Sequence, residues 1–274
     1  MFKILDKKEL AKEITQVTVE APVIAQKAKA GQFVVLVLDE KGERIPLTLA
    51  DWDKAKGTIA LIFQKVGFTT GKLGRLNIGD NIAHILGPLG HPTKVEKLGE
   101  VYCIGGGVGI AEVYPVSRAF KEVGNRVTGI IGARSKDLII LENKMREVCD
   151  ELFVTTDDGS YGKKGFVTDI LKGLIEVIEK STHTKYPALV YAIGPVPMMK
   201  AVSELTKGYN IKTVVSINPI MVDATGMCGA CRCTVDGKTV FGCVDGPDFD
   251  GHKIDFDELQ SRLTLFKEQE NKCI

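Results

Sequence analysis

One acidic residue and three cysteines have the types and spacing of an iron–sulfur ligand set. Plant-type [2Fe–2S] clusters use a C-x4-C-x2-C pattern with a distant fourth cysteine, and here an aspartate stands at the first position. Glycine and alanine between the cysteines let the backbone approach the inorganic sulfides and donate N–H groups to them. The segment therefore predicts a [2Fe–2S] site whose ligands are Asp223, Cys228, Cys231 and Cys243.

Two other interpretations of these cysteines stay open. Zinc also accepts thiolate and carboxylate ligands, in a closed tetrahedral site, so a zinc-stabilised segment is an alternative. Cys233 follows on what reads as an outgoing strand and is interpreted as a bystander; it is the reserve ligand if Asp223 does not coordinate. The remaining cysteines, Cys103, Cys149 and Cys273, carry no motif and are predicted to be core or tail residues.

Composition narrows the class of protein. The 274 residues include 36 basic and 35 acidic ones, and this net charge of +1 gives no support for binding nucleic acid or an anionic membrane surface. The first residues lack a signal-peptide pattern, and no apolar run approaches the roughly 20 residues of a spanning helix. Clustered cysteines fit cofactor ligation in a reducing compartment. We expect a soluble cytoplasmic protein without a membrane partner.

The first part of the chain, up to about Lys97, has the sequence pattern of a β-structure. Short alternating or apolar runs are broken there by glycine and proline, a pattern typical of a small antiparallel barrel. Examples of these runs are 14–20, 32–38, 57–63 and 81–86.

After residue 100 the rhythm changes to strands that alternate with helices. This alternation is typical of a parallel sheet covered on both faces. The expected strands are 101–104, 126–131, 152–155, 188–193 and 213–217, and the expected helices are 110–123, 137–148, 166–179 and 197–207. An amphipathic helix is expected from Phe256 to about Phe266.

Two glycine-containing turns follow strands of this predicted parallel sheet. Gly105-Gly106-Gly107-Val108-Gly109 lies between the first strand and the first helix, and Gly194-Pro195 with Met198 follows the fourth strand. Glycine lets a phosphate approach the backbone, and the helix N-terminus behind it carries partial positive charge. Both turns are therefore predicted to bind a dinucleotide, although any tight strand-to-helix connection can use glycine.

These motifs, the segment 155–165 and the cluster segment resemble the ferredoxin-reductase-like flavoproteins. Within them, the chain is similar to the dihydroorotate dehydrogenase electron-transfer subunits and most similar to the small subunits of NADH-dependent reduced ferredoxin:NADP oxidoreductases, also called sulfide dehydrogenases. The aspartate at the first cluster position separates it from the former group, whose pattern has four cysteines. The resemblance implies a FAD-binding β-barrel at 1–97, an NAD(P)-binding α/β domain at 98–217 and a small [2Fe–2S] segment at 218–274.

The resemblance also implies which residues bind FAD. The segment from Arg44 to Thr48 is similar to the family's R-P-[IL]-[ST] segment, with the arginine one residue earlier than in the usual R-x-Y-[ST] form. A second segment would line the flavin ring and then the pyrophosphate. The implied FAD residues are Arg44, Pro46, Leu47, Thr48, Phe63, Gln64, Val66, Gly67, Thr69 and Thr70. Ordinary strands and turns are the alternative for both segments.

In the α/β region the resemblance implies NAD(H) over the first glycine turn. Arg134, Asp157 and Asp158 would lie near its ribose and adenine parts, and Arg134 could instead pair with the 2′-phosphate of NADP(H). Many relatives have a cysteine where Ile193 stands, so a thiol beside the nicotinamide is not expected.

Together these sites predict an adaptor between two-electron and one-electron chemistry that needs no acid–base side chain. The resemblance implies a larger flavo-iron–sulfur partner subunit, with which the chain would form a heterodimer, ferredoxin as a further partner of the complex, and electron bifurcation. Alternatives are a dihydroorotate dehydrogenase electron-transfer subunit, a sulfide or polysulfide reductase subunit, and a non-enzymatic redox-sensing or zinc-stabilised nucleotide-binding module.

Overall fold

The computed structural model describes residues 1–40, 42–180 and 186–265. They form two compact units. Unit 1 contains 1–93, 217–247 and the described residues from Asp257 onward, and unit 2 contains 94–216 and 248–256. The predicted three-part division by cofactor stays a prediction; in the structure the segment with the cluster cysteines lies in the same unit as the N-terminal β-structure.

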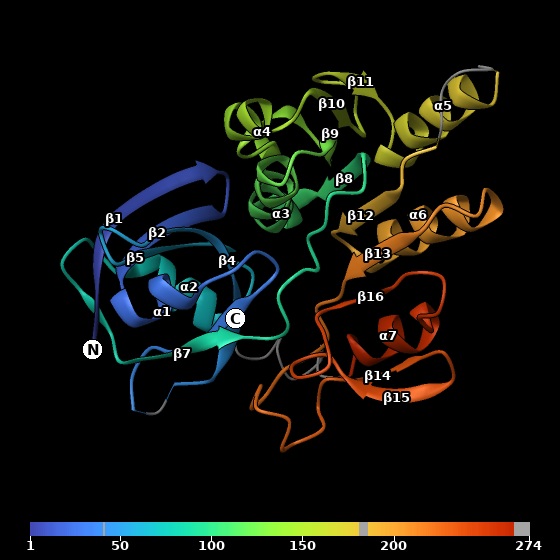
Figure 1. The fold of residues 1–274 in the computed structure, drawn as a ribbon. Coiled ribbons are helices and arrows are strands. Elements are labelled where there is room, and N and C mark those ends of the chain that lie inside the picture. The colour runs from blue at the N-terminus through green and yellow to red at the C-terminus, as the bar shows by residue number, and fades with distance from the viewer. Residues whose placement is uncertain (41, 181–185, 266–274) are drawn as a thin grey trace. The chain divides into compact units, whose positions relative to one another are not determined.

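Unit 1 is built on an antiparallel sheet of seven strands that curls into a near-closed barrel (Figure 1). The strand order is β6-β1-β2-β5-β4-β3-β7. The strands are β1 Phe2–Ala11, β2 Ile14–Glu20, β3 Phe33–Val37, β4 Ile45–Asp53, β5 Thr58–Gln64, β6 Asn81–Ile82 and β7 His84–Leu89.

Two short consecutive strands bring the edges of this sheet together. β6 pairs with β1 and β7 pairs with β3, and only Ala83 separates β6 from β7 in the chain. One nearly continuous segment thus hydrogen-bonds to both edges, which leaves fewer unpaired backbone groups at the rim. The predicted barrel is confirmed, and its expected strands match the observed ones to within a few residues.

Strand β3 is apolar on both of its faces because both are covered. Side chains of a strand alternate between the two faces of the sheet. Val34 and Leu36 belong to the barrel core, whereas Phe33 and Val35 pack with Met221, Ala224, Cys231 and Cys243 of the cluster segment. The apolar run 33–37 therefore carries the cluster segment on the outside of the barrel.

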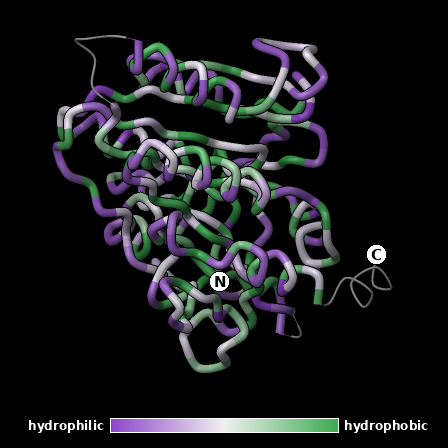
Figure 2. Tube along the Cα trace, turned by 90° about the vertical axis from the view of Figure 1, so that its right-hand side faces the viewer, coloured by the Kyte–Doolittle hydropathy of each residue, from purple (hydrophilic) through white to green (hydrophobic). Residues whose placement is uncertain are grey.

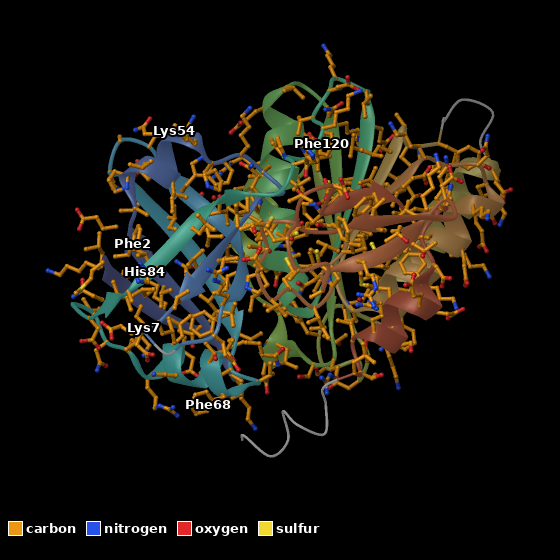
Figure 3. All side chains as sticks on the ribbon, turned by 90° about the horizontal axis from the view of Figure 1, so that it is seen from below. Phe2, Lys7, Lys54, Phe68, His84 and Phe120 are labelled. Atoms are coloured by element: carbon orange, nitrogen blue, oxygen red, sulfur yellow. The ribbon has the colours of Figure 1, made fainter. Side chains whose placement is uncertain are left out.

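Unit 1 also contains two short helices and a β-hairpin. Helix α1 spans Pro22–Lys27 and begins with proline, whose fixed φ suits a first helical turn. Helix α2 spans Phe68–Arg75, and its exposed Phe68 lies at the periphery of the unit (Figure 3). In the cluster segment, β14 (Arg232–Val235) and β15 (Lys238–Phe241) form a hairpin. Asp236 and Gly237 both have positive φ there, as a two-residue type I′ turn requires.

Unit 2 is a seven-stranded sheet in the order β11-β10-β9-β8-β12-β13-β16. All pairs are parallel except β13 with β16. The strands are β8 Glu100–Gly106, β9 Arg126–Ala133, β10 Glu151–Thr156, β11 Lys163–Lys164, β12 Leu189–Ile193, β13 Thr213–Ser216 and β16 Asp248–Asp250. The last strand returns from beyond the cluster segment, a pairing that was not among the expected ones.

Helices cover both faces of this sheet, with α3 and α4 on one side and α5 and α6 on the other (Figure 1). They span Ile110–Glu122 (α3), Glu142–Val148 (α4), Val167–Glu179 (α5) and Val196–Gly208 (α6), and short 3₁₀ turns cover Gly107–Gly109 (η1) and Lys136–Leu138 (η2). Helices cover both faces because the strands are apolar on both.

One expected helix was wrong in extent. The region 137–148 contains the short turn η2 and then α4, which starts only at Glu142. Leu141 separates the two with a φ of 55°, outside the right-handed helical region. Helix α7 spans Phe256–Arg262, so its predicted start holds, but it is shorter than predicted because residues 263–265 form a turn. Phe266 and Cys273 lie outside the described residues.

Hydrophobic stretches of the trace are short and alternate with polar ones (Figure 2). Among the helices formed by the described residues, none combines the length and the apolar character needed to cross a membrane.

Candidate functional site

The two glycine turns predicted to bind a dinucleotide lie side by side in unit 2. Strands β8 and β12 are neighbours in the sheet, with Ile193 opposite Gly105. The chain continues outward from β8 to β9 on one side and from β12 to β13 on the other. The carboxyl ends of β8 and β12 thus form the topological switch point, where open parallel sheets bind their ligands.

Close packing explains the glycines in these turns. A Cβ on Gly109 would lie 2.7 Å from the carbonyl oxygen of Ile193, and one on Gly194 would lie 3.1 Å from the Cα of Gly106. Gly107 has a φ of 56°, and a Cβ there would meet nothing within 4 Å. The glycines let the backbones of the two turns approach each other at the N-terminus of α3, an arrangement that fits the pyrophosphate of a dinucleotide.

Met198 closes this surface from the second turn. A Cβ on Gly106 would collide with its sulfur and would lie 3.2 Å from Pro195. The structure therefore brings Gly105, Gly106, Gly107, Val108, Gly109, Gly194, Pro195 and Met198 to one place. Their contact with NAD(H) stays a prediction.

The residues predicted beside the ribose and adenine lie on the next two loops of the same sheet edge. The backbone N–H of Asp157 donates to the carbonyl of Ala133 at 3.1 Å, and that of Asp158 donates to the carbonyl of Arg134 at 3.2 Å. Arg134 is exposed, and the side chain of Asp158 accepts from Ser160. The hydrogen bonds from Ser160 lower the pKa of Asp158, which keeps that carboxylate charged.

A buried polar cluster behind the first glycine turn was not predicted. The hydroxyl of Tyr191, on β12, lies 3.0 Å from Glu112 Oε1 on α3 and 3.1 Å from Asp248 Oδ1 on β16. Tyr191 is fully buried, and Glu112 is 5% exposed. The cluster joins the first turn of α3 to the returning strand β16. Its three members lie far apart in the sequence, so no local pattern could have revealed it.

In unit 1 the predicted cluster residues lie on a tightly curled loop. Ala224, Gly226 and Gly229 all have positive φ, with values of 61°, 86° and 67°. Glycine adopts such values at little cost, whereas alanine does so rarely. Repeated left-handed residues curl the loop, so that backbone N–H groups point toward the sulfurs.

Two of the predicted sulfur ligands are in contact. Cys231 Sγ and Cys243 Sγ lie 3.2 Å apart, and both residues are buried. Cys228 is exposed, and its sulfur accepts from the N–H of Ala230 at 3.5 Å. That N–H is the main cause of a lowered Cys228 pKa, with the N–H groups of Asp223 and Val222 contributing. Burial raises the pKa of Cys243 to about 12.

The side chain of Asp223 is held by residues on two sides. Arg44 Nη1 donates to its Oδ1, and the hydroxyl and N–H of Thr225 donate to its Oδ2, the latter at 3.2 Å. These bonds, those from Thr225 first, lower the pKa of Asp223. The structure thus gives Arg44 a carboxylate partner, whereas its predicted contact with a flavin phosphate stays a prediction.

Cys233 is a further cysteine of the cluster segment and was not predicted as a ligand. It is fully buried on β14, and burial raises its pKa to about 12, with Glu258 and Arg262 among the nearby charges. Arg262 of α7 also donates to the carbonyl of Ala230 at 3.0 Å, in the middle of the loop. These contacts support the interpretation of Cys233 as a core residue, and its role stays a prediction.

The predicted FAD residues are spread over β4, β5 and the start of α2. Phe63 is a barrel-core side chain, and Val66 is exposed. Gln64 ends β5, and Pro46, Leu47 and Thr48 pair with β3. At α2, the side chain of Thr70 caps the helix by accepting from Gly67 N at 3.0 Å.

A cavity of about 580 Å³ adjoins the first turns of α2. Thr69 donates to Glu43 at 2.5 Å there, and Lys72 is paired with Asp39. Its walls thus carry one cation and two carboxylates. Contacts between this helix and a pyrophosphate stay a prediction.

The donor set of the loop fits an iron–sulfur cluster in its chemistry. In the described part of the chain, no three His, Cys, Asp or Glu side chains are grouped as a metal site would group them. Nevertheless, the Cys231 and Cys243 sulfurs are in contact, and the Cys228 sulfur lies beside N–H groups of the same loop, among them the backbone N–H of Asp223. N–H groups directed at sulfur are a feature of Fe–S sites.

Comparison with known families gives two matches. Residues 218–255 match the iron–sulfur cluster binding domain of dihydroorotate dehydrogenase B, and residues 103–204 match the oxidoreductase NAD-binding domain. The first contains all four predicted cluster ligands, and the second contains both glycine turns.

Full-length relatives extend this likeness to the barrel. A dihydroorotate dehydrogenase B (NAD(+)) electron transfer subunit homolog of Thermotoga maritima is 44% identical over 98% of this chain and 92% of its own length. The corresponding electron transfer subunit of Shouchella clausii is 30% identical over 90% of this chain and 94% of its own.

A solved structure described as an NADH-dependent reduced ferredoxin-NADP oxidoreductase, studied for flavin-based electron bifurcation, is 43% identical. The superposition covers 100% of this chain and 96% of the solved chain, with a TM-score of 0.92. The fold is thus ferredoxin-reductase-like, with an antiparallel barrel, a parallel-sheet NAD domain and a C-terminal Fe–S segment. The chain is an oxidoreductase subunit that acts on NAD(P)H, with FAD, NAD(H) and a [2Fe–2S] cluster as cofactors. It belongs to the family of dihydroorotate dehydrogenase B electron-transfer subunits and their homologues.

Proposed function

We propose that this chain is the NADH-handling subunit of an electron-bifurcating NADH-dependent ferredoxin:NADP oxidoreductase. When bound together, nicotinamide, FAD and a [2Fe–2S] cluster supply the conversion between paired and single electrons. The observation that carries the proposal is the coexistence, in one chain, of the paired glycine turns and a cluster loop with a carboxylate at its first ligand position.

The nucleotide-binding residues act through their backbone. The glycines of the turns 105–109 and 194–198 offer backbone groups beside the N-terminus of α3, which together bind and orient a pyrophosphate. Glu112 and Tyr191 hold the first turn of α3 from behind. These contacts orient the dinucleotide without transferring a proton to or from it.

The cluster-binding residues act through their side chains. Cys228, Cys231 and Cys243 supply thiolates, and Asp223 supplies the fourth, harder ligand. Packing on Phe33 and Val35 holds the loop on the barrel. Replacing thiolate by carboxylate changes ligand charge and softness, which are quantities that set a cluster's reduction potential.

A larger partner subunit completes this function in our proposal. In the described part of the chain we assign no second one-electron site, so the electrons must leave to another protein. The description of the 43% identical solved protein, an NADH-dependent reduced ferredoxin-NADP oxidoreductase, includes ferredoxin and NADP. The same partners are proposed here, with the heterodimer as the working unit.

The test is anaerobic purification from the native source, without a tag on a partner. Expected are a second, larger polypeptide, FAD, and iron and sulfide in equal amounts. NADPH oxidation should then require NAD⁺ and oxidised ferredoxin together, with little activity when either is left out. A monomer fully active with ferredoxin, or equal rates with a single acceptor, would contradict the proposal. Zinc in place of iron would favour the structural module instead.

A second candidate is the electron-transfer subunit of a dihydroorotate dehydrogenase. It is favoured by the match of residues 218–255 to that enzyme's cluster domain. The same purified complex distinguishes the two, because this candidate predicts NAD⁺ reduction by dihydroorotate with neither NADP(H) nor ferredoxin present.

A further inference from the structure

We propose that Arg44 is a positioning residue for the cluster ligand Asp223, and that it sets the cluster's potential rather than holding a flavin phosphate. The inference rests on the proposed function, in which Asp223 is a ligand. It starts from one ion pair: Arg44 Nη1 contacts Asp223 Oδ1 although 179 positions separate the two residues.

The ion pair joins the barrel to the cluster loop. Arg44 directly precedes β4, and β4 pairs with β3, whose Phe33 and Val35 carry the cluster segment. The guanidinium is thus anchored on the barrel next to the cluster loop, within the same unit. Arg44 is half exposed, at 49%, but Asp223 is only 21% exposed. A pair between two solvated side chains contributes little, whereas this carboxylate is constrained on both oxygens.

The hydrogen bonds leave Asp223 able to bind a metal. An ionised carboxylate has about four lone-pair sites, two on each oxygen. Thr225 occupies Oδ2 with its N–H and hydroxyl, and Arg44 occupies one site on Oδ1. One site on Oδ1 is left for iron. Outer partners of this kind orient a ligand and change its donor strength.

The charge of Arg44 gives the direction of the effect. Reduction adds a negative charge to the cluster, and a nearby cation stabilises that charge. Removing the cation should therefore lower the midpoint potential of the cluster. Because the guanidinium bonds to the ligand atom itself, the effect should depend on the ligand at position 223 being a carboxylate.

The experiment compares Arg44→Gln, Arg44→Lys and the control Arg75→Gln, which removes the same charge from an exposed position of α2. In the anaerobic complex, redox titration followed by paramagnetic resonance gives the cluster potential, and absorbance gives the FAD content. Arg44→Gln should make cluster reduction about tenfold less favourable, or about 59 mV lower for one electron, with FAD content unchanged. Arg44→Lys should keep most of the potential but alter the resonance spectrum, and Arg75→Gln should change neither.

A double-mutant cycle with Asp223→Cys isolates the pair. The shift caused by Arg44→Gln should be much smaller in the Asp223→Cys background, where the bond to the ligand atom is lost and only the through-space effect of the charge remains. An equal shift there would show a general charge effect and overturn the positioning role. Loss of FAD from Arg44→Gln with an unchanged potential would restore the flavin role, and a change in neither quantity would also refute the inference. If Asp223→Cys leaves the cluster spectrum as in the natural protein, the ligand assignment fails; iron, sulfide and flavin counts still test the proposed function separately.

Discussion

The two glycine turns of unit 2, 105–109 and 194–198, are here called the nucleotide edge. They differ from the cluster loop of unit 1 in whether main-chain or side-chain groups would contact the cofactor. At the nucleotide edge the turns pack so closely that a Cβ on Gly109 would meet a backbone carbonyl at 2.7 Å, and the groups that we propose to bind the dinucleotide come from the main chain. In the cluster loop the proposed binding groups are side chains, on a loop curled by left-handed residues such as Ala224 and Gly226. Where the backbone is closely packed, as at Gly109, the first site is sensitive to added atoms, whereas the second site is sensitive to a change of donor atom. Substitutions should therefore fail for different reasons in the two regions.

The largest effect is expected from exchanging sulfur for oxygen in the cluster loop. Cys231→Ser should lose most of its iron, because a serine hydroxyl is a poor substitute for a thiolate ligand. Cys233→Ser should keep its iron and instead lose about 1 to 3 kcal/mol of stability, because it buries a hydroxyl. Iron analysis, paramagnetic resonance and urea unfolding measure both. A cluster retained in the first variant and lost in the second would make Cys233 the ligand.

Next in size is a single methyl group at the nucleotide edge. Gly109→Ala should weaken NADH binding at least about tenfold and cost about 1 to 3 kcal/mol, because the added Cβ meets the backbone of Ile193 and cannot be relieved by a side-chain movement. Calorimetric titration with NADH measures the affinity.

The matched control for that change is Gly173→Ala, in the middle of α5, where a Cβ meets nothing within 4 Å. It should stabilise the protein by up to about 1 kcal/mol through helix propensity and leave NADH binding unaltered. Normal NADH affinity in Gly109→Ala would show that the paired turns are a packing feature and that the dinucleotide binds elsewhere.

A substitution in the cluster of Tyr191, Glu112 and Asp248 tests whether the region of the first glycine turn also depends on side-chain hydrogen bonds. Tyr191→Phe removes a hydroxyl between Glu112 and Asp248 and should cost about 1 to 3 kcal/mol in urea unfolding, because the buried Glu112 carboxyl group loses a hydrogen bond. Tyr186→Phe, at a partly exposed ring, should stay within about 0.5 kcal/mol. Equal stability of the two variants would show that the hydroxyl contributes nothing.

The smallest effect concerns pH and the end of β16. Burial lowers the pKa of His252 below its ordinary value of 6.5, and its Nε2 lies 3.0 Å from Thr206 Oγ1. As the pH falls, His252 is therefore protonated in the unfolded chain before it is protonated in the folded one. Its contribution to the free energy of unfolding is fully present above the unfolded pKa, and it is lost as the pH falls from there through the folded pKa. His252→Gln should flatten this part of the curve of unfolding free energy against pH. An unchanged slope would assign the acid sensitivity to other groups.

Patterns of short range predicted most of the elements. Apolar alternation located β2, β3, β5 and the segment of β6 and β7, and strand–helix alternation located β8, β9, β10, β12 and β13 with their helices, whereas β1, β4 and β11 were not among the expected strands. The helix at 137–148 was predicted too long because its periodicity continues through Leu141, whose positive φ delays the start of α4 to Glu142. A helix pattern carries no signal for one left-handed residue.

Contacts of long range were missed. β16 joins unit 2 after the chain has visited unit 1, and Arg44 meets Asp223 across 179 positions. The resemblance assigned Arg44 to a flavin phosphate, because its neighbours match the family's flavin segment. Only the folded chain shows the carboxylate beside it.

The sequence by itself determined the donors and the local shapes: a carboxylate and three thiols at cluster spacing, glycines where turns must be tight, and strands or helices by their periodicity. These follow from side-chain chemistry and from backbone preferences over a few residues. The tertiary structure alone decided which turns lie side by side, which face of β3 carries the cluster segment, and which cation accompanies Asp223. Such contacts depend on packing between distant segments, and their energies are not encoded in either segment alone.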